Sequence, residues 1–364
     1  MIPFSDFKGH YAAVKAQVDE SIQRVMDSGW YVLGKEVEAF ESEFAQWLGA
    51  EHVVSCASGT EAIALALMAF DIGQGDEVIT TSLTAFPTIT GINQVGATPV
   101  VVDVLQESAL INPDEIAKAI TPKTRAILPV HLYGQSCDLS ALRQLADKHD
   151  LVLIEDCAQS TGSQTGLGTS GTIGDAGCFS FYPTKNLGAF GDGGAVSVKS
   201  EKAADKLRSL RNYGQTERYY HDFPGINSRL DEMQAAVLRA KLPMLQSWNE
   251  RRQAIAASYH SILPEHCLLS PATASSHVYH LFVIKTANRD RFMASMKERG
   301  IGTLIHYPVP ILHQKAFDGR ALPCPITESL CMQVVSLPCY PELTDEQVVY
   351  IGQQASEVLA ELNS

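Results

Sequence analysis

The sequence lacks the features by which nucleic-acid-binding and membrane-spanning proteins are recognised. It has no basic tract, and its 41 Asp and Glu residues outnumber its 28 Lys and Arg residues, which gives a formal net charge of −13. Binding to nucleic acid or to an anionic membrane is therefore not expected. No apolar stretch reaches the roughly 20 residues that a membrane-spanning helix needs. Residues 1–8 resemble neither a signal peptide nor a transit peptide, so we expect a cytoplasmic protein.

The local signatures of several enzyme classes are also missing. The eleven histidines form no HExxH motif, no GxSxG motif occurs, and no GxGxxG motif follows the first predicted strand. These absences argue against a metal hydrolase, a serine hydrolase and a dinucleotide-binding enzyme. The eight cysteines form no CxxC pair and have no metal-ligand spacing. Most lie in or beside apolar runs, where a free cysteine packs as a small hydrophobic residue, so we expect reduced thiols and no metal site.

Apolar runs alternate with helical patterns through most of the first 200 residues. Such alternation is typical of an α/β fold, in which helices cover both faces of a mostly parallel sheet. We predict a sheet of seven strands flanked by helices. The predicted strands are 52–56, 77–82, 98–104, 125–130, 151–155, 177–182 and 194–198, and the predicted helices are 11–28, 35–48, 60–70, 86–95, 113–120 and 138–149.

The character of the chain changes after about residue 200. Long helices are predicted over 201–212 and 230–262, and the remainder is a smaller α+β region that contains many prolines. A chain of 364 residues is long enough for about two domains. We place the boundary in the long helix near residue 245. The prediction is a large α/β domain with an N-terminal segment over 1–245 and a small α+β domain over 246–364.

One stretch, residues 151–194, combines a buried strand with two oppositely charged side chains. Residues 151–154 are four consecutive aliphatics, as in a parallel strand covered on both faces, and Asp156 follows where this strand should end. Lys185 comes shortly after another apolar run, 177–182. Ligands of open α/β sheets gather at the carboxyl ends of the strands. The two side chains are therefore either a simple ion pair or the two ends of a pyridoxal phosphate site, in which Lys185 binds the cofactor covalently and Asp156 contacts its ring nitrogen.

A second segment, residues 56–67, is predicted to contain a strand end, a glycine turn and a helix. Ser58 and Glu61 have the spacing of a capping box, so one interpretation is simply a well-capped helix. The other interpretation uses the same geometry. The free N–H groups at the N-terminus of a helix, here near Gly59 and Thr60, are suited to bind a phosphate dianion.

Three further residues have either an ordinary structural role or a role at the cofactor. The hydroxyl of Ser180 would satisfy a main-chain group or bind the phosphate. Gln159 would be a polar residue at a helix start or a donor to the phenolic oxygen of the cofactor. Phe86 would pack in the core or cover a flat ring. The residues alone leave each pair of interpretations open.

Six motifs occur in order along the chain: SGTEA (58–62), EDCAQS (155–160), SFYPTKNL (180–187), GDGG (191–194), RNYG (211–214) and GINSRLDEMQAA (225–236). Together they resemble the DegT/DnrJ/EryC1/StrS family of sugar aminotransferases. The resemblance extends over about residues 1–345, which is nearly the whole chain. It implies the fold type I of pyridoxal-phosphate-dependent transferases, with pyridoxal 5'-phosphate as cofactor.

The resemblance also implies a role for each candidate residue. Lys185 would bind the cofactor and act as general base, and Asp156 would keep the ring nitrogen protonated. Asn227 would reach the phosphate in the site of the neighbouring subunit, in a homodimer with shared active sites, although it also fits a turn or a helix cap. The family often has an aromatic residue where this chain has Ala85 beside Phe86. The implied cofactor-binding residues are Gly59, Thr60, Phe86, Asp156, Gln159, Ser180, Lys185 and Asn227.

The expected substrates follow from one more segment. Residues 305–314 (IHYPVPILHQ) are similar to the His-Tyr-Pro segment of members that act on nucleotide-linked 3-keto-6-deoxyhexoses. We therefore expect amino transfer from an amino acid, L-glutamate, to dTDP-3-keto-6-deoxyhexose, in the biosynthesis of an amino sugar for a surface polysaccharide or a glycosylated metabolite. Alternatively, the segment only positions the small domain. The candidate substrate-binding residues are Tyr31, Tyr182, Tyr213, Arg229, His306, Tyr307 and His313. Arg211 and Arg218 are, like Arg229, either counterions for a diphosphate or ordinary surface or interface cations.

Other functions fit parts of the same pattern. A 4-keto sugar, or a UDP carrier in place of dTDP, is an open alternative. Relatives that have histidine in place of the lysine are dehydratases, and the presence of Lys185 argues against that chemistry. A non-catalytic regulatory protein is a third possibility. The combination of Lys185, Asp156 and Gln159 argues against it, because no structural role requires a lysine at that position.

Overall fold

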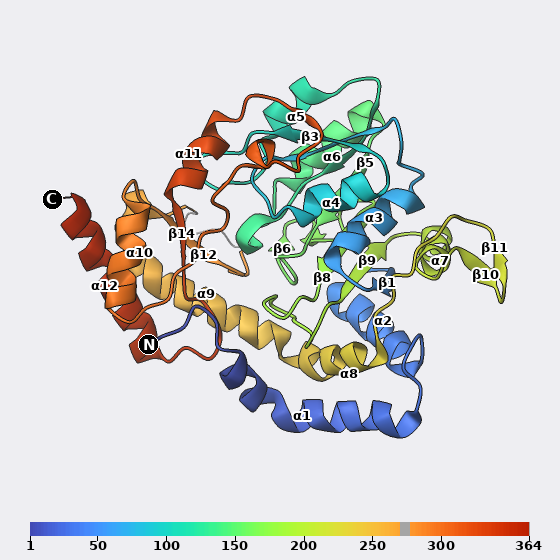
Figure 1. Ribbon diagram of the computed structural model, residues 1–364, viewed down its shortest axis with the longest axis horizontal. Coiled ribbons are helices and arrows are strands. Elements are labelled where there is room, and N and C mark those ends of the chain that lie inside the picture. Colours follow the sequence, from blue (N-terminus) through green and yellow to red (C-terminus); the bar gives the residue numbers. More distant parts are fainter. Residues whose placement is uncertain (270–276, 364) are drawn as a thin grey trace.

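A central sheet of eight strands organises the chain in this computed structural model, which describes residues 1–269 and 277–363 (Figure 1). The order across the sheet is β1-β9-β8-β5-β4-β2-β3-β13. Strand β9 is antiparallel to both of its neighbours, whereas all pairs from β8 to β13 are parallel. The strands are β1 (His52–Cys56), β2 (Glu77–Thr81), β3 (Thr98–Val102), β4 (Thr124–Leu128), β5 (Val152–Asp156), β8 (Ala176–Ser180), β9 (Gly194–Val198) and β13 (Arg320–Ala321).

All seven predicted strands are present, and the sheet has one more strand than predicted. The additional strand, β13, comes from the C-terminal third of the chain and pairs with the edge strand β3. It is only two residues long, so it has no hydrophobic pattern that could be detected in the sequence. The class is confirmed as a mostly parallel α/β sheet flanked by helices, and the predicted number of strands is corrected from seven to eight.

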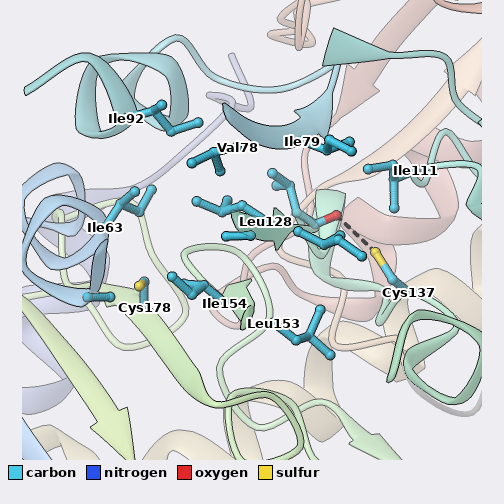
Figure 2. Packing of buried hydrophobic residues seen from close by; sticks show 14 of the residues in the cluster. Ile63, Val78, Ile79, Ile92, Ile111, Leu128, Cys137, Leu153, Ile154 and Cys178 are labelled. Atoms are coloured by element: carbon cyan, nitrogen blue, oxygen red, sulfur yellow. Dashed lines mark hydrogen bonds between the residues drawn. The ribbon is translucent and has the colours of Figure 1, made fainter. Parts of the chain in front are cut away.

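Helices cover both faces of the sheet because neighbouring strand residues point to opposite sides. On β8, Cys178 belongs to the largest core, together with residues of α3 such as Ile63 (Figure 2). The next residue, Phe179, belongs to a second core with Phe44 of α2 and with Leu238, which lies further along the chain. The helices of this part are α1 (Phe7–Ser28), α2 (Lys35–Leu48), α3 (Gly59–Ala69), α4 (Pro87–Gln94), α5 (Pro113–Ala119), α6 (Leu139–His149) and α7 (Glu201–Leu210).

The long helix predicted over 230–262 is divided into two. Helix α8 (Glu232–Lys241) ends at a short 3-10 turn, η2 (Leu242–Met244), and α9 (Leu245–Ile262) follows. Pro243 lies in this turn, and a proline cannot donate the main-chain hydrogen bond that a continuous α-helix needs. The two helices run one after the other along one side of the molecule (Figure 1).

The C-terminal region has its own core around α9. Buried residues of α9, α10 and α12 meet there, including Ile255, Phe292 and Ile351. The boundary predicted near residue 245 coincides with the start of α9, but α11 and β13 pack on the large sheet. The division into 1–245 and 246–364 stays a prediction, and residues 270–276 and 364 lie outside the described part. The elements are α10 (Arg289–Glu298), α11 (Pro325–Gln333), α12 (Asp345–Asn363), β12 (Phe282–Lys285) and β14 (Val334–Leu337).

Two small hairpins complete the described chain. They are β6 (Gln164–Thr165) with β7 (Gly168–Thr169), and β10 (Gln215–Glu217) with β11 (Tyr220–His221). The second hairpin extends from the end of the molecule opposite to α10 and α12 (Figure 1). Among the helices of residues 1–269 and 277–363, none combines the length and the apolar character that crossing a bilayer requires.

Candidate active site

A cavity of about 350 Å³ lies at the carboxyl ends of the parallel strands. Its wall brings together the end of β5, the end of β8, the N-terminus of α3 and the segment between β2 and α4. These segments lie far apart in the sequence and meet because parallel strands end at the same edge of the sheet. The lining residues that were also predicted are Gly59, Thr60, Asp156, Gln159, Ser180, Tyr182 and Lys185.

Asp156 is the last residue of β5 and is only 5% exposed. One carboxylate oxygen, Oδ1, accepts a hydrogen bond from the main-chain N–H of Ala158 (3.1 Å), and Oδ2 accepts one from the hydroxyl of Thr88 (3.0 Å). Burial raises the pKa of Asp156, and these two bonds and the positive charge of Lys185 oppose the rise. The carboxylate is therefore fixed in orientation at the floor of the cavity.

Lys185 lies in the loop that joins β8 to β9. Its main-chain N–H donates to the carbonyl oxygen of Tyr182 (2.8 Å), and the N–H of Ala189 closes the loop by donating to the carbonyl oxygen of Phe181 (2.7 Å). Burial lowers the pKa of Lys185 to about 8, against the opposing effect of the Asp156 carboxylate. A substantial fraction of this amine is therefore neutral at mildly alkaline pH, as a nucleophile or a general base must be.

The N-terminus of α3 forms the other end of the cavity. Ser58 caps the helix by accepting a hydrogen bond from the N–H of Glu61 (3.2 Å), while the first N–H groups of the helix have no partner within the helix itself. A Cβ atom on Gly59 would lie 2.6 Å from the Cβ of Ser180, so only glycine permits this approach of α3 to β8. With Thr60 and Ser180 in the wall, the helix end has the form of an anion site.

Gln159 connects the cavity to the C-terminal region. Its side-chain oxygen accepts a hydrogen bond from the N–H of Tyr133 (2.6 Å), and its side-chain nitrogen donates to the hydroxyl of Tyr307 (3.0 Å). Burial raises the pKa of Tyr307 to about 12, so the phenol stays protonated. Burial, together with the charge of Lys185, lowers the pKa of His306 to about 4, and its ring lies 2.9 Å (Nδ1 to Oγ) from Ser336. Both residues of this segment are thus neutral polar groups near Lys185.

A sequence model of the DegT/DnrJ/EryC1/StrS aminotransferase family matches residues 13–355. The chain belongs to this family. It is similar to a dTDP-3-amino-3,4,6-trideoxy-alpha-D-glucose transaminase from Streptomyces venezuelae, with 46% identity over 96% of this chain and 94% of the relative. A UDP-N-acetyl-3-dehydro-alpha-D-glucosamine 3-aminotransferase from Acidithiobacillus ferrooxidans is 44% identical over 96% of each chain.

The solved structures agree with this assignment. The crystal structure of S. venezuelae DesV, in complex with a ketimine intermediate, matches with a TM-score of 0.95 and 46% identity over 98% of each chain. The fold of this aminotransferase is therefore the fold type I of pyridoxal-phosphate-dependent transferases, as the sequence resemblance implied. The assignment of the chain to a transferase family of enzymes is likewise confirmed.

Other predicted residues of the aminotransferase lie outside this cavity. Phe86 packs with Ile89 and Ile311 in a small cluster, and Ala85 and Pro87 occupy the part of the wall that we expected of Phe86. His313 is exposed and pairs with Glu328 (3.3 Å).

The remaining candidates, with the exception of Arg211, lie on or near the surface of the single chain. Tyr31 and Tyr213 are each about half exposed, and Asn227 is exposed. The guanidinium of Arg229 lies over the ring of Tyr213, 5.3 Å from its centre. Of the two other proposed counterions, Arg218 stacks on Tyr219, whereas Arg211 is buried in an ion pair with Glu41. Because its charge is already neutralised, Arg211 is not available to a diphosphate, and that expectation was wrong.

Two features of the aminotransferase site were not predicted. Thr88 holds Asp156 from the neighbouring segment, as described above. Glu155, the residue before Asp156, points to the opposite side of β5 and accepts hydrogen bonds from the N–H groups of Gly171 (2.8 Å), Ile173 (3.0 Å) and Gly174 (2.7 Å) and from Nε2 of His131 (2.9 Å). The only sequence signal for this role was the pair of adjacent acidic residues at a strand end.

Proposed function

We propose that this protein transfers an amino group from L-glutamate to dTDP-3-keto-6-deoxyhexose with pyridoxal 5'-phosphate as its cofactor. The observation that carries the proposal is that Lys185 and Asp156 line one cavity whose other end is the N-terminus of α3. An amine of lowered pKa, a fixed carboxylate and an anion site match the aldehyde, the ring nitrogen and the phosphate of this cofactor. The residues present therefore fit the group.

The cofactor would be held by residues of three segments. Gly59, Thr60 and Ser180 would bind its phosphate, and Asp156 would accept a hydrogen bond from its protonated ring nitrogen. Gln159 would face its phenolic oxygen. When bound, pyridoxal phosphate withdraws electrons from the α-carbon of the amino-acid donor and so acidifies its C–H bond.

Lys185 would then move the proton. Its amine takes a proton from the α-carbon of the donor and later returns one to the sugar carbon that receives the nitrogen. A pKa of about 8 suits both tasks, because the base is available near neutral pH and its conjugate acid can still donate. Asp156 would stabilise the positive charge on the ring nitrogen of the bound cofactor, and Thr88 keeps the carboxylate oriented.

The keto sugar would lie against the neutral polar wall. Tyr182 lines the cavity, and Tyr307 and His306 lie beside Gln159 and Lys185. The two relatives named above support a 3-keto over a 4-keto sugar, since the names of both place the amino group at carbon 3. The sugar is linked to dTDP in the name of one relative and to UDP in the name of the other, and the two relatives are nearly equally identical to this chain. The choice of dTDP therefore rests on the S. venezuelae transaminase and on the His-Tyr-Pro segment.

A second copy of the chain would complete the site. Tyr31, Tyr213 and Asn227 lie outside the cavity of their own chain and present exposed side chains. Further large aromatics, including Tyr219 and Tyr220, are also exposed, which is typical of an interface. In the proposed homodimer these residues reach the partner's site, with Asn227 at the phosphate. Light scattering of the purified protein tests the dimer directly.

The decisive experiment is a product analysis by mass spectrometry. The cofactor-loaded protein is incubated with glutamate and, in turn, with dTDP- and UDP-linked 3-keto and 4-keto sugars. We expect the dTDP-linked 3-amino sugar and an equal amount of 2-oxoglutarate, and no turnover by Lys185→Ala, whose fold should be unchanged by circular dichroism. A deoxygenated sugar without loss of glutamate would instead identify a dehydratase. No turnover by the wild type on any substrate would favour a regulatory role.

A further inference from the structure

Arg252 of α9 is a buried cation on which the carboxylate of Glu342 acts electrostatically without forming an ion pair. Its side chain is 8% exposed, and no carboxylate of the described residues forms an ion pair with it. Nη1 donates to the main-chain carbonyls of Cys339 and Tyr279 (3.5 Å for the second), while Nε has no hydrogen-bond partner in the described chain. Burial lowers the pKa of Arg252, yet a guanidinium stays charged in proteins. Buried charges are normally paired, so this one calls for a ligand.

The position of Arg252 is next to the lysine loop. A cavity of about 370 Å³, between the N-terminal segment and the C-terminal region, is lined by Arg252, Thr184 and His306. A smaller adjoining cavity of about 50 Å³ is lined by Arg252, Thr184 and also Lys185. The charges of Lys185 and Arg252 both act on the ring of His280, whose pKa is lowered mainly by burial. Arg252 and Lys185 therefore line the same small region.

Besides Arg252 and Lys185, no described lining residue of the two cavities is a lysine or an arginine, while the carboxylates of Asp6 and Glu342 also line the smaller one. His280 and His306 are neutral, because burial lowers the pKa of each well below its ordinary value. His10 is engaged with Glu342 (2.7 Å, Nδ1 to Oε1). Beside Lys185, Arg252 is thus the permanent positive charge of this region within the described residues. One planar guanidinium matches one carboxylate, whereas a diphosphate usually requires several cations.

We propose that Arg252 binds a carboxylate of the amino-acid donor while Lys185 acts on its α-carbon. This inference rests on the proposed function, because it supplies a binding residue for the first of the two substrates. A donor such as glutamate brings two negative charges to a protein of net charge −13 whose cavity already contains Asp156. A buried guanidinium offsets this repulsion and orients the donor, since charge-assisted hydrogen bonds in a desolvated site are strong and directional.

The test separates the two halves of the reaction. Cofactor-loaded wild type, Arg252→Gln, Arg252→Lys and the control Arg251→Gln are mixed with glutamate, and the change in cofactor absorbance gives an apparent donor Kd. Arg251 is the matched control because it is the next residue of α9 and pairs on the surface with Asp345 (2.7 Å). We expect a rise in Kd of about tenfold to hundredfold for Arg252→Gln, from the loss of a charged hydrogen bond. Arg252→Lys should show a smaller rise, and Arg251→Gln should change Kd less than about twofold.

The second half-reaction shows whether Arg252 acts only as a structural residue. The amine form of each protein is mixed with the keto sugar nucleotide, and this step should be nearly unchanged in both Arg252 variants. Equal losses in the two half-reactions, or a loss confined to the sugar nucleotide, would overturn the proposal. If Arg252→Gln does not fold, Arg252→Lys decides by the same comparison, because an ammonium cannot form the two parallel bonds of a guanidinium.

The choice of donor identifies the carboxylate. Glutamate, glutamine and alanine share the α-carboxylate, and only glutamate has a second one. A similar penalty for all three donors in Arg252→Gln assigns the α-carboxylate, and a penalty for glutamate alone assigns the side-chain carboxylate. An unchanged Kd for every donor refutes the proposal. If wild type itself fails to react with any amino acid, the proposed function fails instead, so the two failures are distinguishable.

Discussion

Replacement of Glu155 by glutamine tests how strongly the hydrogen bonds of this carboxylate stabilise the segments next to the active site. Glu155 is fully buried, and its two oxygens accept four hydrogen bonds. Nδ1 of His131 accepts the main-chain N–H of Cys137 (3.0 Å), so Nε2 carries a proton, which it donates to Glu155. The carboxylate therefore ties β5, the segment that follows β4 and the loop 171–174 together next to Asp156.

The loss in free energy of unfolding follows from the donors that each oxygen of Glu155 accepts. Oε1 accepts from Ile173 and Gly174, and Oε2 accepts from Gly171 and His131. In Glu155→Gln one oxygen becomes an NH₂ group, which turns its hydrogens toward two buried donors. Each unsatisfied buried donor costs about 1–3 kcal/mol, so the variant should lose about 2–6 kcal/mol. Because folded proteins are stable by only about 5–15 kcal/mol, this loss is large.

The assay is urea unfolding followed by far-ultraviolet circular dichroism, with Glu51→Gln as control. Glu51 is exposed, and its replacement should change the free energy of unfolding by less than about 0.5 kcal/mol. Burial alone would raise the pKa of Glu155, but the bonds from His131 and the main-chain amides outweigh it and lower the pKa below 4.5. The stabilisation is therefore present above about pH 4.5 and is lost as the pH falls through the folded-state pKa, so wild type and variant should converge in acid. Equal stability of Glu155→Gln and Glu51→Gln at pH 7 would refute the reasoning.

Three further predictions concern the cavity itself. Thr88→Val removes a hydrogen bond to Asp156 and should slow amino transfer about tenfold in single-turnover absorbance measurements, whereas Thr88→Ser should react nearly as wild type. Gly59→Ala places a methyl group 2.6 Å from the Cβ of Ser180, so equilibrium dialysis should show at least about tenfold weaker binding of pyridoxal phosphate. In cofactor-free protein, acylation of Lys185 should rise with pH up to about 8 and then level off, as followed by peptide mass spectrometry, because only the neutral amine reacts. A rate that still climbs steeply above pH 9 would contradict the lowered pKa.

The longer strands could be predicted because a strand buried in the sheet appears in the sequence as a run of apolar residues. Residues 151–154 form an uninterrupted aliphatic run, and the structure buries β5 on both faces. The edge strand β13 could not be predicted in this way, because a strand of two residues is too short to show a hydrophobic pattern. The break between α8 and α9 was missed although Pro243 marked it, since the helical pattern on both sides outweighed a single residue.

The site was predictable where one rule placed several residues together. Asp156, Ser180 and the start of α3 meet because parallel strands end at one edge of a sheet. Contacts between side chains of distant segments were not predictable in the same way. Phe86 illustrates the difference: the correct segment was identified, but whether residue 85 or 86 faces the cavity depends on how the turn before α4 packs against Ile311.

The alternation of side chains along β5 sets a limit on how this strand can vary. Its last two residues, both acidic, serve opposite sides: Glu155 fastens a loop and Asp156 faces the cavity. A single residue inserted into or deleted from β5 would shift the strand by one position. The side chains of Glu155 and Asp156 would then each point to the opposite face of the sheet. The number of residues in β5 is therefore more constrained than the identity of its aliphatic members. Leu153 and Ile154 can be exchanged for other apolar residues at modest cost, whereas a change in length would remove both anchors at once.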